Sequence, residues 1–322
     1  MSKAEQSLWT LESCWNDTLA IKKKPQERRD HIWAGEIGMP FYDRYLKMSG
    51  IQPTEPLEDR VLRKMSAGIW FEKQIEYILQ TIGILKEAQT RVEIPATDKT
   101  LKVTGKIDQL AGGITDWNEA RNRVKTYKFP EFIEAICMKL IEGFEKKYPK
   151  GLEEVLYEIK SVNSQVFWAK KDYLEEAYPH HRFQLYTYLK ATKKEKGRIL
   201  YISKDDLTIK EFLVMNPHPK LEEEWQKDVE QMTYYWKNQI EPPKPEFVVF
   251  DKRKKLRFQH NKEKCIIQGC WTENWMVKWS QYFSMVTGCE TEEEWMEKIK
   301  PDIRDRNIIL KDAYKVKLEG KK

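Results

Sequence analysis

The stretch "GLEEVLYEIKSVNSQVFW", residues 151–168, decides the fold because it holds a short strand with two charges on one face. Its residues 155–160, "VLYEIK", alternate with the period of two that is typical of a β-strand. Residues i and i+2 of a strand point to the same side, so Glu158 and Lys160 lie next to each other. A polar turn, Ser161 to Ser164, follows.

The Glu-x-Lys triplet has an ordinary explanation as well as a functional one. The chain is 34% charged, so such triplets occur by chance. A strand-borne pair also forms as a weak ion pair at the rim of a sheet. On the triplet alone we favour a structural role, and the surrounding sequence must decide.

The composition describes a globular chain with a mild basic excess. The 322 residues suggest one large domain or two ordinary ones, and 40% hydrophobic and 12% aromatic residues exclude a disordered chain. A formal net charge of +6 is compatible with a polyanionic partner. Two basic runs, residues 21–29 and 251–257, could be solvated surface or nucleic-acid contacts.

The cysteines and the hydropathy predict the compartment. The count is odd, which argues against a disulfide framework and for a reducing compartment. The five residues are Cys14, Cys137, Cys265, Cys270 and Cys289. No stretch approaches the roughly 20 apolar residues of a membrane helix, and the start of the chain is too polar for a secretory signal. We expect a soluble cytoplasmic protein with no membrane partner.

Turn and periodicity signals place the elements along the chain. Helices are expected at 4–20, just before Gly50, at 56–83 with Gly83 as C-cap, at 130–147, over most of 170–194 with a break or restart at Pro179, and at 219–239. The apolar face expected for the helix at 56–83 consists of Ile69, Ile75, Ile78 and Leu79. Strands are expected within 84–96, 99–114, 155–160 and, around a turn at Asp205-Asp206, within 197–214.

This order predicts an α/β fold with a mixed central sheet flanked by helices. We expect a helical N-terminal region at 1–66, a core at 67–245 with an insertion at about 114–152, and a mainly helical appendage at 246–322.

Acidic, basic and amide side chains recur on the central elements. Glu72 lies on a helix, Asp108 on a strand, and Gln184 and Tyr188 are four residues apart on one helix face. Carboxylates on neighbouring strands suit Mg²⁺ or Mn²⁺, which prefer oxygen ligands and polarise a phosphoryl group. The pattern therefore favours phosphodiester hydrolysis.

Five motifs in order resemble a known family. "GKID", "EIK" and "QLYTY" are similar to the motifs of the PD-(D/E)XK nucleases, and to the RecB-type branch that includes the CRISPR-associated exonucleases. "AGEIGMPFYDRYLKMSG" and "AGIWFEK" resemble the same branch upstream of its catalytic strands. The likeness runs from about Ala34 to Val214.

The resemblance implies a role for each matching residue. It implies a PD-(D/E)XK restriction-endonuclease-like core and a metal-dependent DNA nuclease, of exonuclease type, acting on DNA ends or single strands. The matching positions are Asp108, Glu158 and the Ile159 carbonyl as ligands of Mg²⁺ or Mn²⁺, Glu72 as the acidic residue of the first-motif helix and a further metal ligand, Lys160 as the catalytic lysine, and Gln184 and Tyr188 as the motif bordering the site. The alternative is a catalytically inactive nucleic-acid-binding relative.

The sequence departs from this branch in two ways. Many relatives hold an iron–sulfur cluster, but Met39 stands near the place of its early cysteine, and four thiolates at cluster spacing are not visible. We expect no cluster, although Cys14 could join the three late cysteines in space. About 45 residues also separate Asp108 from the strand of Glu158.

Other side chains allow two interpretations. Trp271, Trp275 and Trp279 recur every four residues, which favours a helix packed on the core over a platform for single-stranded bases. His181 shares a helix face with Gln184, and either a substrate contact or a surface role fits it. In the run at 251–257, we expect DNA contacts from Lys252, Arg253, Lys254 and Lys255.

Overall fold

The computed structural model describes residues 10–22, 25, 27–51, 59–164, 174–243, 247–252 and 255–260. The chain divides into two compact units. The larger unit holds the described residues up to Asn238, apart from 25–28 and 39–51. Those two segments belong to the smaller unit together with the described residues from Gln239 onward.

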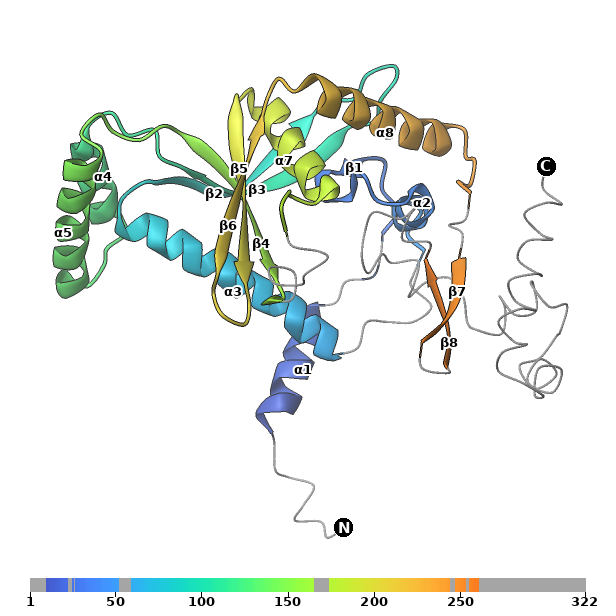
Figure 1. Ribbon diagram of the computed structural model, residues 1–322, viewed down its shortest axis with the longest axis horizontal. Coiled ribbons are helices and arrows are strands. Elements are labelled where there is room, and N and C mark those ends of the chain that lie inside the picture. The colour runs from blue at the N-terminus through green and yellow to red at the C-terminus, as the bar shows by residue number, and fades with distance from the viewer. Residues whose placement is uncertain are drawn as a thin grey trace, which may run out of the picture. The chain divides into compact units, whose positions relative to one another are not determined.

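Within the described residues, the larger unit is built on a mixed sheet of six strands (Figure 1). The strands are β1 (Ile32–Trp33), β2 (Leu85–Ile94), β3 (Val103–Ala111), β4 (Val155–Val162), β5 (Lys196–Ser203) and β6 (Ile209–Met215). Their order is β1-β3-β4-β5-β6, and β2 also pairs with β3. The pairs β2–β3, β3–β4 and β5–β6 are antiparallel, whereas β1–β3 and β4–β5 are parallel. The expected α/β class with a mixed sheet is confirmed.

Helices pack on the strands of this sheet. The helices of the larger unit are α1 (Leu11–Lys22), the short 3-10 helix η2 (Ala34–Glu36), α3 (Asp59–Thr81), α4 (Trp117–Thr126), α5 (Glu131–Lys147), α7 (Pro179–Thr192) and α8 (Pro219–Lys237). Helix α3 contacts β2, β3 and β4, and α7 contacts β2 to β6 and η2. Both helices that carry expected site residues therefore lie against the strands that carry the others.

The packing of α3 differs in part from the expected apolar face. Ile75 packs against Ile159, Leu200 and Ile202 of the sheet, with Phe71 and Leu79 alongside. These helix positions are four residues apart and form one narrow stripe. The predicted face was too wide, because Ile69 and Ile78 lie beside that stripe and are 58% and 46% exposed.

The end of α3 agrees with the sequence prediction. Gly83 follows the helix with a φ of +68°, a conformation that glycine adopts without steric cost. A Cβ at this position would come within 2.3 Å of the Ala120 carbonyl oxygen, so a side chain would also clash there.

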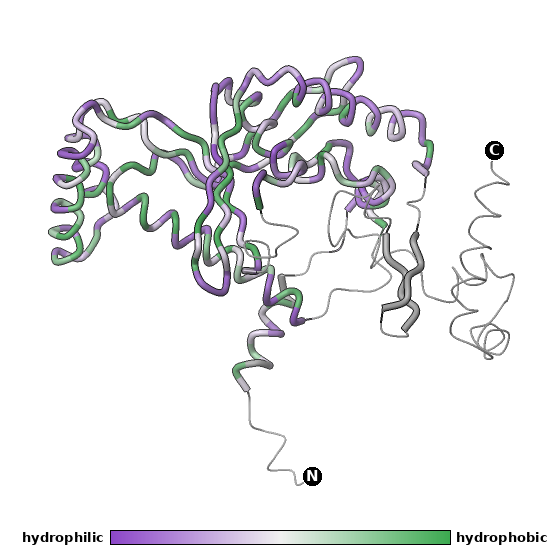
Figure 2. Tube along the Cα trace, viewed as in Figure 1, coloured by the Kyte–Doolittle hydropathy of each residue, from purple (hydrophilic) through white to green (hydrophobic). Residues whose placement is uncertain are grey.

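The insertion between β3 and β4 forms a helical pair whose apolar side chains share one core cluster with the end of α3 and the neighbouring strands. The predicted helix at 130–147 is confirmed as α5, whereas α4 was not predicted. Apolar side chains of both helices pack together with Ile114, and Figure 2 shows hydrophobic and hydrophilic residues alternating along the pair. A bridge between Ile114 and Leu152 joins the two ends of the insertion.

Local signals placed the elements after β4, except that the helix expected over most of 170–194 does not include the described residues 174–178. Helix α7 begins at Pro179, whose missing N–H costs nothing at a helix start. It ends at Lys193 in the left-handed conformation. Strands β5 and β6 flank the expected turn at Asp205-Asp206, and α8 matches the expected long helix.

The smaller unit contains one helix and one hairpin among its described residues. It contains helix α2 (Phe41–Met48), which was expected before Gly50. Within the region expected as a mainly helical appendage, the described residues form a hairpin of β7 (Phe247–Lys252) and β8 (Lys255–His260), which was not predicted. Aromatic and β-branched residues dominate β7, which favours a strand. Trp271, Trp275 and Trp279 lie outside the described residues.

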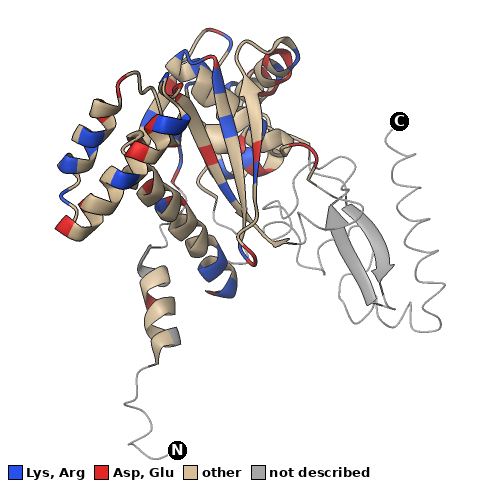
Figure 3. Cartoon of the chain, turned by 60° about the vertical axis from the view of Figure 1, so that its left-hand side comes forward, with Lys and Arg blue, Asp and Glu red and all other residues tan. Residues whose placement is uncertain are grey.

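Among the described residues, no helix combines the length and the apolar character needed to cross a membrane. Acidic and basic residues are interspersed over the sheet and the helices (Figure 3).

Candidate active site

The candidate site lies where β3 and β4 separate. Their antiparallel ladder contains three residue pairs and ends at Gln109 and Tyr157. Continuing the same register would set Asp108 opposite Glu158. Instead, Asp108 Oδ2 accepts a hydrogen bond of 2.8 Å from the Ile159 backbone N–H. The side chain of Asp108 thus takes the place of a ladder acceptor, and the two carboxylates meet at the point of separation.

Glu158 is almost completely buried, and only one of its two carboxylate oxygens has a polar partner. Its side chain is 1% exposed, and its Oε1 forms an ion pair with the ammonium group of Lys160, which is 24% exposed. Its other oxygen, Oε2, is buried without a hydrogen-bond partner in the described structure. A buried carboxylate oxygen without a donor is costly, and such an atom calls for an explanation.

The acids at this site are difficult to ionise without a cation. Burial raises the pKa of Glu158 to about 8, and the neighbouring charge of Asp108 adds to the shift, while Lys160 opposes it. Burial also raises the pKa of Asp108. Burial alone would lower the pKa of Lys160, but Glu158 and Asp108 outweigh it and raise that pKa. One ammonium group therefore faces more than one carboxylate.

Helix α3 contributes the third acid, Glu72. Burial raises the pKa of Glu72 to about 7, and repulsion from Asp108 is the next cause. The position of this residue is fixed from β3, because Gln109 Nε2 donates a hydrogen bond of 2.9 Å to the Glu72 carbonyl. The side chain of Glu72 also accepts a long hydrogen bond, 3.5 Å, from Gln89 Nε2.

Gln184 and Tyr188 border the acids from α7. Gln184 Nε2 donates to the Tyr188 hydroxyl over 2.8 Å. Burial raises the pKa of Tyr188, and the charge of Glu158 contributes. The Tyr188 ring rests on Gly105 of the "GKID" motif, where a Cβ would come within 2.4 Å of the ring. Glycine at this position therefore allows α7 to approach β3.

His181 lies on α7, three residues before Gln184. Its Nδ1 is 2.7 Å from the hydroxyl of Tyr201, which accepts a hydrogen bond from the Tyr178 N–H. Tyr201 is paired with Lys160 across β4 and β5. Burial, assisted by the charge of Lys160, lowers the pKa of His181 well below its usual range. The imidazole is therefore neutral at pH 7.

The expected residues fall into two groups in the structure. Glu72, Asp108, Glu158 and Lys160 are close enough to shift one another's pKa, and Gln184 and Tyr188 adjoin them. The basic run does not belong to this unit: Lys252 and Lys255 lie in the β7–β8 hairpin, and Arg253 and Lys254 are outside the described residues. Its DNA contacts stay a prediction.

Sequence reasoning missed three polar residues at the site. Gln89, Gln109 and Tyr201 each contact an expected site residue or orient one. No spacing or motif distinguishes these side chains from other polar residues on strands. Only the pairing of the strands brings them to the acids.

The donor set suits a hard divalent cation. The buried Oε2 of Glu158 and the neighbouring carboxylate of Asp108 are oxygen donors of the kind that Mg²⁺ and Mn²⁺ take. Within the described ranges, no three His, Cys, Asp or Glu side chains gather closely enough to hold a metal alone. Mg²⁺ commonly takes one or two carboxylates and keeps several waters.

The described cysteines do not test the expectation that the protein has no iron–sulfur cluster. Cys14 is exposed and Cys137 is buried, and both are free. Cys265, Cys270 and Cys289 lie outside the described residues. The absence of a cluster therefore stays a prediction.

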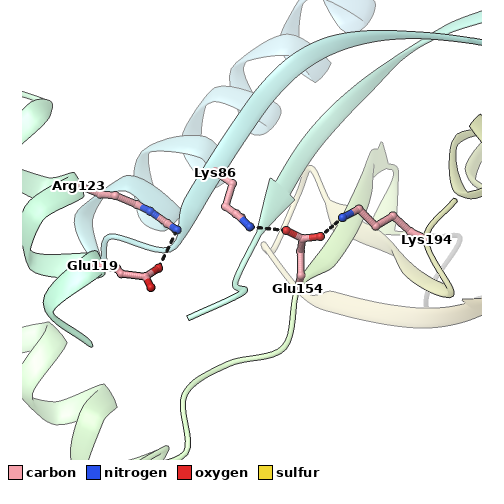
Figure 4. A network of polar contacts seen from close by, with 5 residues as sticks. All are labelled: Lys86, Glu119, Arg123, Glu154 and Lys194. Atoms are coloured by element: carbon pink, nitrogen blue, oxygen red, sulfur yellow. Dashed lines mark hydrogen bonds and ion pairs between the residues drawn. The ribbon is translucent and has the colours of Figure 1, made fainter. Parts of the chain in front are cut away.

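A second group of charges lies just before β4 and contrasts with the site. Glu154 forms ion pairs with Lys86 and Lys194, which come from β2 and from the segment after α7 (Figure 4). Glu153 forms an ion pair with Lys196. These lysines lower the pKa of both glutamates. The ion pairs join elements that are distant in sequence, at one end of β4.

Comparisons with known proteins add little to this description. No family model and no curated protein matches the chain. A solved structure described as "Crystal structure of SSO0001" is similar with a TM-score of 0.42 and 15% sequence identity, over 72% of this chain and 92% of that chain.

Proposed function

We propose that this chain is a divalent-metal-dependent DNA nuclease with a PD-(D/E)XK core of the RecB type, and that it acts as an exonuclease on DNA ends or single strands. One observation carries the proposal. Asp108 and Glu158 converge where two strands separate, beside Lys160, and one buried oxygen of Glu158 has no partner. A cation at this position would satisfy that oxygen and offset the cost of ionising both acids.

The side chains of the site match the needs of phosphodiester hydrolysis. Asp108, Glu158 and the Ile159 carbonyl would hold Mg²⁺ or Mn²⁺, and Glu72 would add a further carboxylate. When bound, the cation polarises a phosphoryl oxygen and lowers the pKa of a water. Lys160, kept charged by its acidic neighbours, stabilises the negative charge that develops on the phosphate. Tyr188 and Gln184 close the α7 side of the site.

DNA would reach this site with help from groups outside the acidic cluster. His181 is a neutral donor or acceptor on the α7 side, suited to a phosphate or sugar contact. The basic run at 252–255 would supply affinity that is independent of sequence and sensitive to salt. These contacts position the strand, whereas the chemistry belongs to the four charged residues.

Cleavage of labelled DNA tests the proposal directly. The full chain is incubated with end-labelled linear DNA and with a closed circle of the same sequence, with Mn²⁺ or with a chelator. We expect metal-dependent shortening of the linear DNA from its ends and an intact circle. Nicked or linearised circles would mean an endonuclease. Binding without cleavage in Mn²⁺ and Mg²⁺ would contradict the proposal and favour the inactive nucleic-acid-binding relative.

A further inference from the structure

The backbone of Gln89 is unusual for a residue in the middle of a strand. The neighbouring pairs of β2 and β3, Ala88 with Gln109 and Thr90 with Ile107, put Gln89 opposite Asp108. Gln89 nevertheless has a φ of +57°, in the left-handed region. Such a conformation costs a non-glycine residue about 1–3 kcal/mol and persists only where surrounding contacts impose it.

The other residues of this kind have local explanations. Each of them lies at a turn or at the end of a helix, where left-handed residues are common. Among the described non-glycine residues with positive φ, the remaining ones are Lys128, Lys193, Leu207 and Gln239. Gln89 differs because pairing with β3 continues on both sides of it. Its conformation therefore comes from contacts of its side chain or of its neighbours.

The side chain of Gln89 reaches two acids of the site. Its Nε2 donates to Glu72 Oε2 over 3.5 Å, and from its place opposite Asp108 its amide lowers the pKa of that acid. A primary amide carries two N–H donors and no charge, so it can serve two carboxylates at once. Lys160 forms its ion pair with Glu158. Gln89 thus adjoins the two acids that this ion pair does not include: it hydrogen-bonds Glu72 and lies opposite Asp108 in the sheet.

We propose that Gln89 is a positioning residue whose amide holds the carboxylates of Glu72 and Asp108 side by side and so sets the affinity of the site for a divalent cation. The inference rests on the proposed function, because it assumes that these carboxylates meet a cation. Residues that hydrogen-bond the ligating carboxylates typically change metal affinity or activity by about 10–100-fold when they are replaced.

Two substitutions distinguish the effect of the Gln89 amide group from the effect of its left-handed backbone. Gln89→Gly removes the amide and permits the positive φ without steric cost. Gln89→Met removes the amide but keeps an unbranched chain of similar length. Leu207→Gly is the control, because Leu207 has a φ of +60° in the β5–β6 turn and its side chain is 55% exposed. Thermal unfolding of each full-length variant establishes that it is folded.

Titration calorimetry with Mn²⁺ alone, in the absence of DNA, gives the readout. We expect Gln89→Gly and Gln89→Met to bind Mn²⁺ about 10–100-fold more weakly than the wild type, and Leu207→Gly to bind it equally well. Cleavage by both Gln89 variants should recover at high Mn²⁺, since the catalytic groups remain.

Two different results would overturn the inference. Wild-type affinity in folded Gln89→Gly would show that the amide does not set the site, while the proposed nuclease would stand. No Mn²⁺ binding and no cleavage by the wild-type chain would instead remove the proposed function together with this inference.

Discussion

Two groups of carboxylates can be compared: Glu153 and Glu154, and the group of Glu158 with Asp108 and Glu72. Glu158 follows Glu154 by only four residues, yet the pKa values of the two groups are shifted in opposite directions. Glu153 and Glu154, just before β4, each have a lysine partner, and their pKa values are lowered. Glu158, inside β4, shares one lysine with two further acids, and its pKa is raised to about 8. The ion pairs of the first group link strands to one another. The second group buries more acids than cations, which is unfavourable, and other interactions of the fold must offset that free energy.

The comparison teaches how to separate a structural cluster from a functional one. Both groups are rich in Glu and Lys, and neither composition nor spacing distinguishes them. The balance of charges distinguishes them. In a structural ion pair the two charges neutralise each other, whereas a buried group with more acids than bases is stabilised by binding a cation.

The largest expected effect comes from removing one acid of the unmatched group. Asp108→Asn should abolish metal-dependent cleavage, a loss of at least about 10³-fold, and should weaken Mn²⁺ binding. The matched change in the other group, Glu154→Gln, should leave cleavage intact. Rates on end-labelled DNA and Mn²⁺ calorimetry check both. Undiminished Mn²⁺ binding in Asp108→Asn would rule out Asp108 as a ligand.

Removing the lysine of each group gives the next effect. Lys160→Ala should lower kcat by about 10²-fold and change DNA affinity far less, because the ammonium acts on charge that develops during the reaction. Lys194→Ala, which removes a partner of Glu154, should change neither quantity. Single-turnover rates and DNA binding by anisotropy measure the two. A near wild-type rate in Lys160→Ala would leave this residue only its ion pair with Glu158.

The two groups should also give opposite pH dependence of stability in metal-free protein. Folding raises the pKa of Glu158 from 4.5 to about 8 and that of Glu72 to about 7, so the folded state binds more protons than the unfolded state between these values. Stability contributed by their protonated forms is present at low pH and is lost as the pH rises from about 5 to 8. Glu154, whose pKa is lowered, contributes stability that is lost only in acid, as the pH falls below about 4.5.

Thermal unfolding with a chelator, recorded across that range, tests this opposition. Glu158→Gln should flatten the loss of stability between pH 5 and 8, and Glu154→Gln should not. Added Mn²⁺ should stabilise the wild type more at pH 8 than at pH 5, because it binds the ionised acids. A wild type whose stability rises over this range without metal would contradict the electrostatic description of the site.

The smallest effect concerns the stability of the matched group itself. Glu154→Gln should lower the free energy of unfolding by at most about 1 kcal/mol, the usual range for partly exposed ion pairs. Glu154 is 20% exposed, and its partners Lys86 and Lys194 are 33% and 37% exposed. Urea unfolding at low and high salt measures the change. A loss of several kcal/mol would mean that this network, too, carries a buried charge.

Local sequence signals were sufficient for most elements but not for their pairing. Pro179 and the turn at Asp205-Asp206 mark boundaries that the structure keeps. Helix α4 was missed because its apolar pattern rests on only three buried residues: Trp117, Ala120 and Val124. The β7–β8 hairpin was missed because the basic run covers its turn and obscures the alternation on either side.

From the sequence, only those residues of the candidate site that belong to recognisable motifs could be predicted. Glu72, Asp108, Glu158 and Lys160 were found because residue type and order identified them. Gln89 could not be found in this way, because its role depends on the register between β2 and β3 and on one left-handed residue. The structure also brings Asp108 to the strand of Glu158 across about 45 intervening residues, which periodicity cannot predict.

The helical pair α4–α5 affects how β3 and β4, which about 45 residues separate, come together during folding. Closing a flexible loop of that length costs about 3 kcal/mol of chain entropy from the logarithmic term alone. The pair packs its apolar side chains into a cluster shared with the end of α3 and the sheet, and the bridge between Ile114 and Leu152 joins the two ends of the insertion. Once the pair has formed, only a few residues on each side separate Ala111 from Val155, the first partners of the β3–β4 ladder. We infer that the insertion converts a distant contact into a nearly local one, so that the two strands of the site meet early in folding.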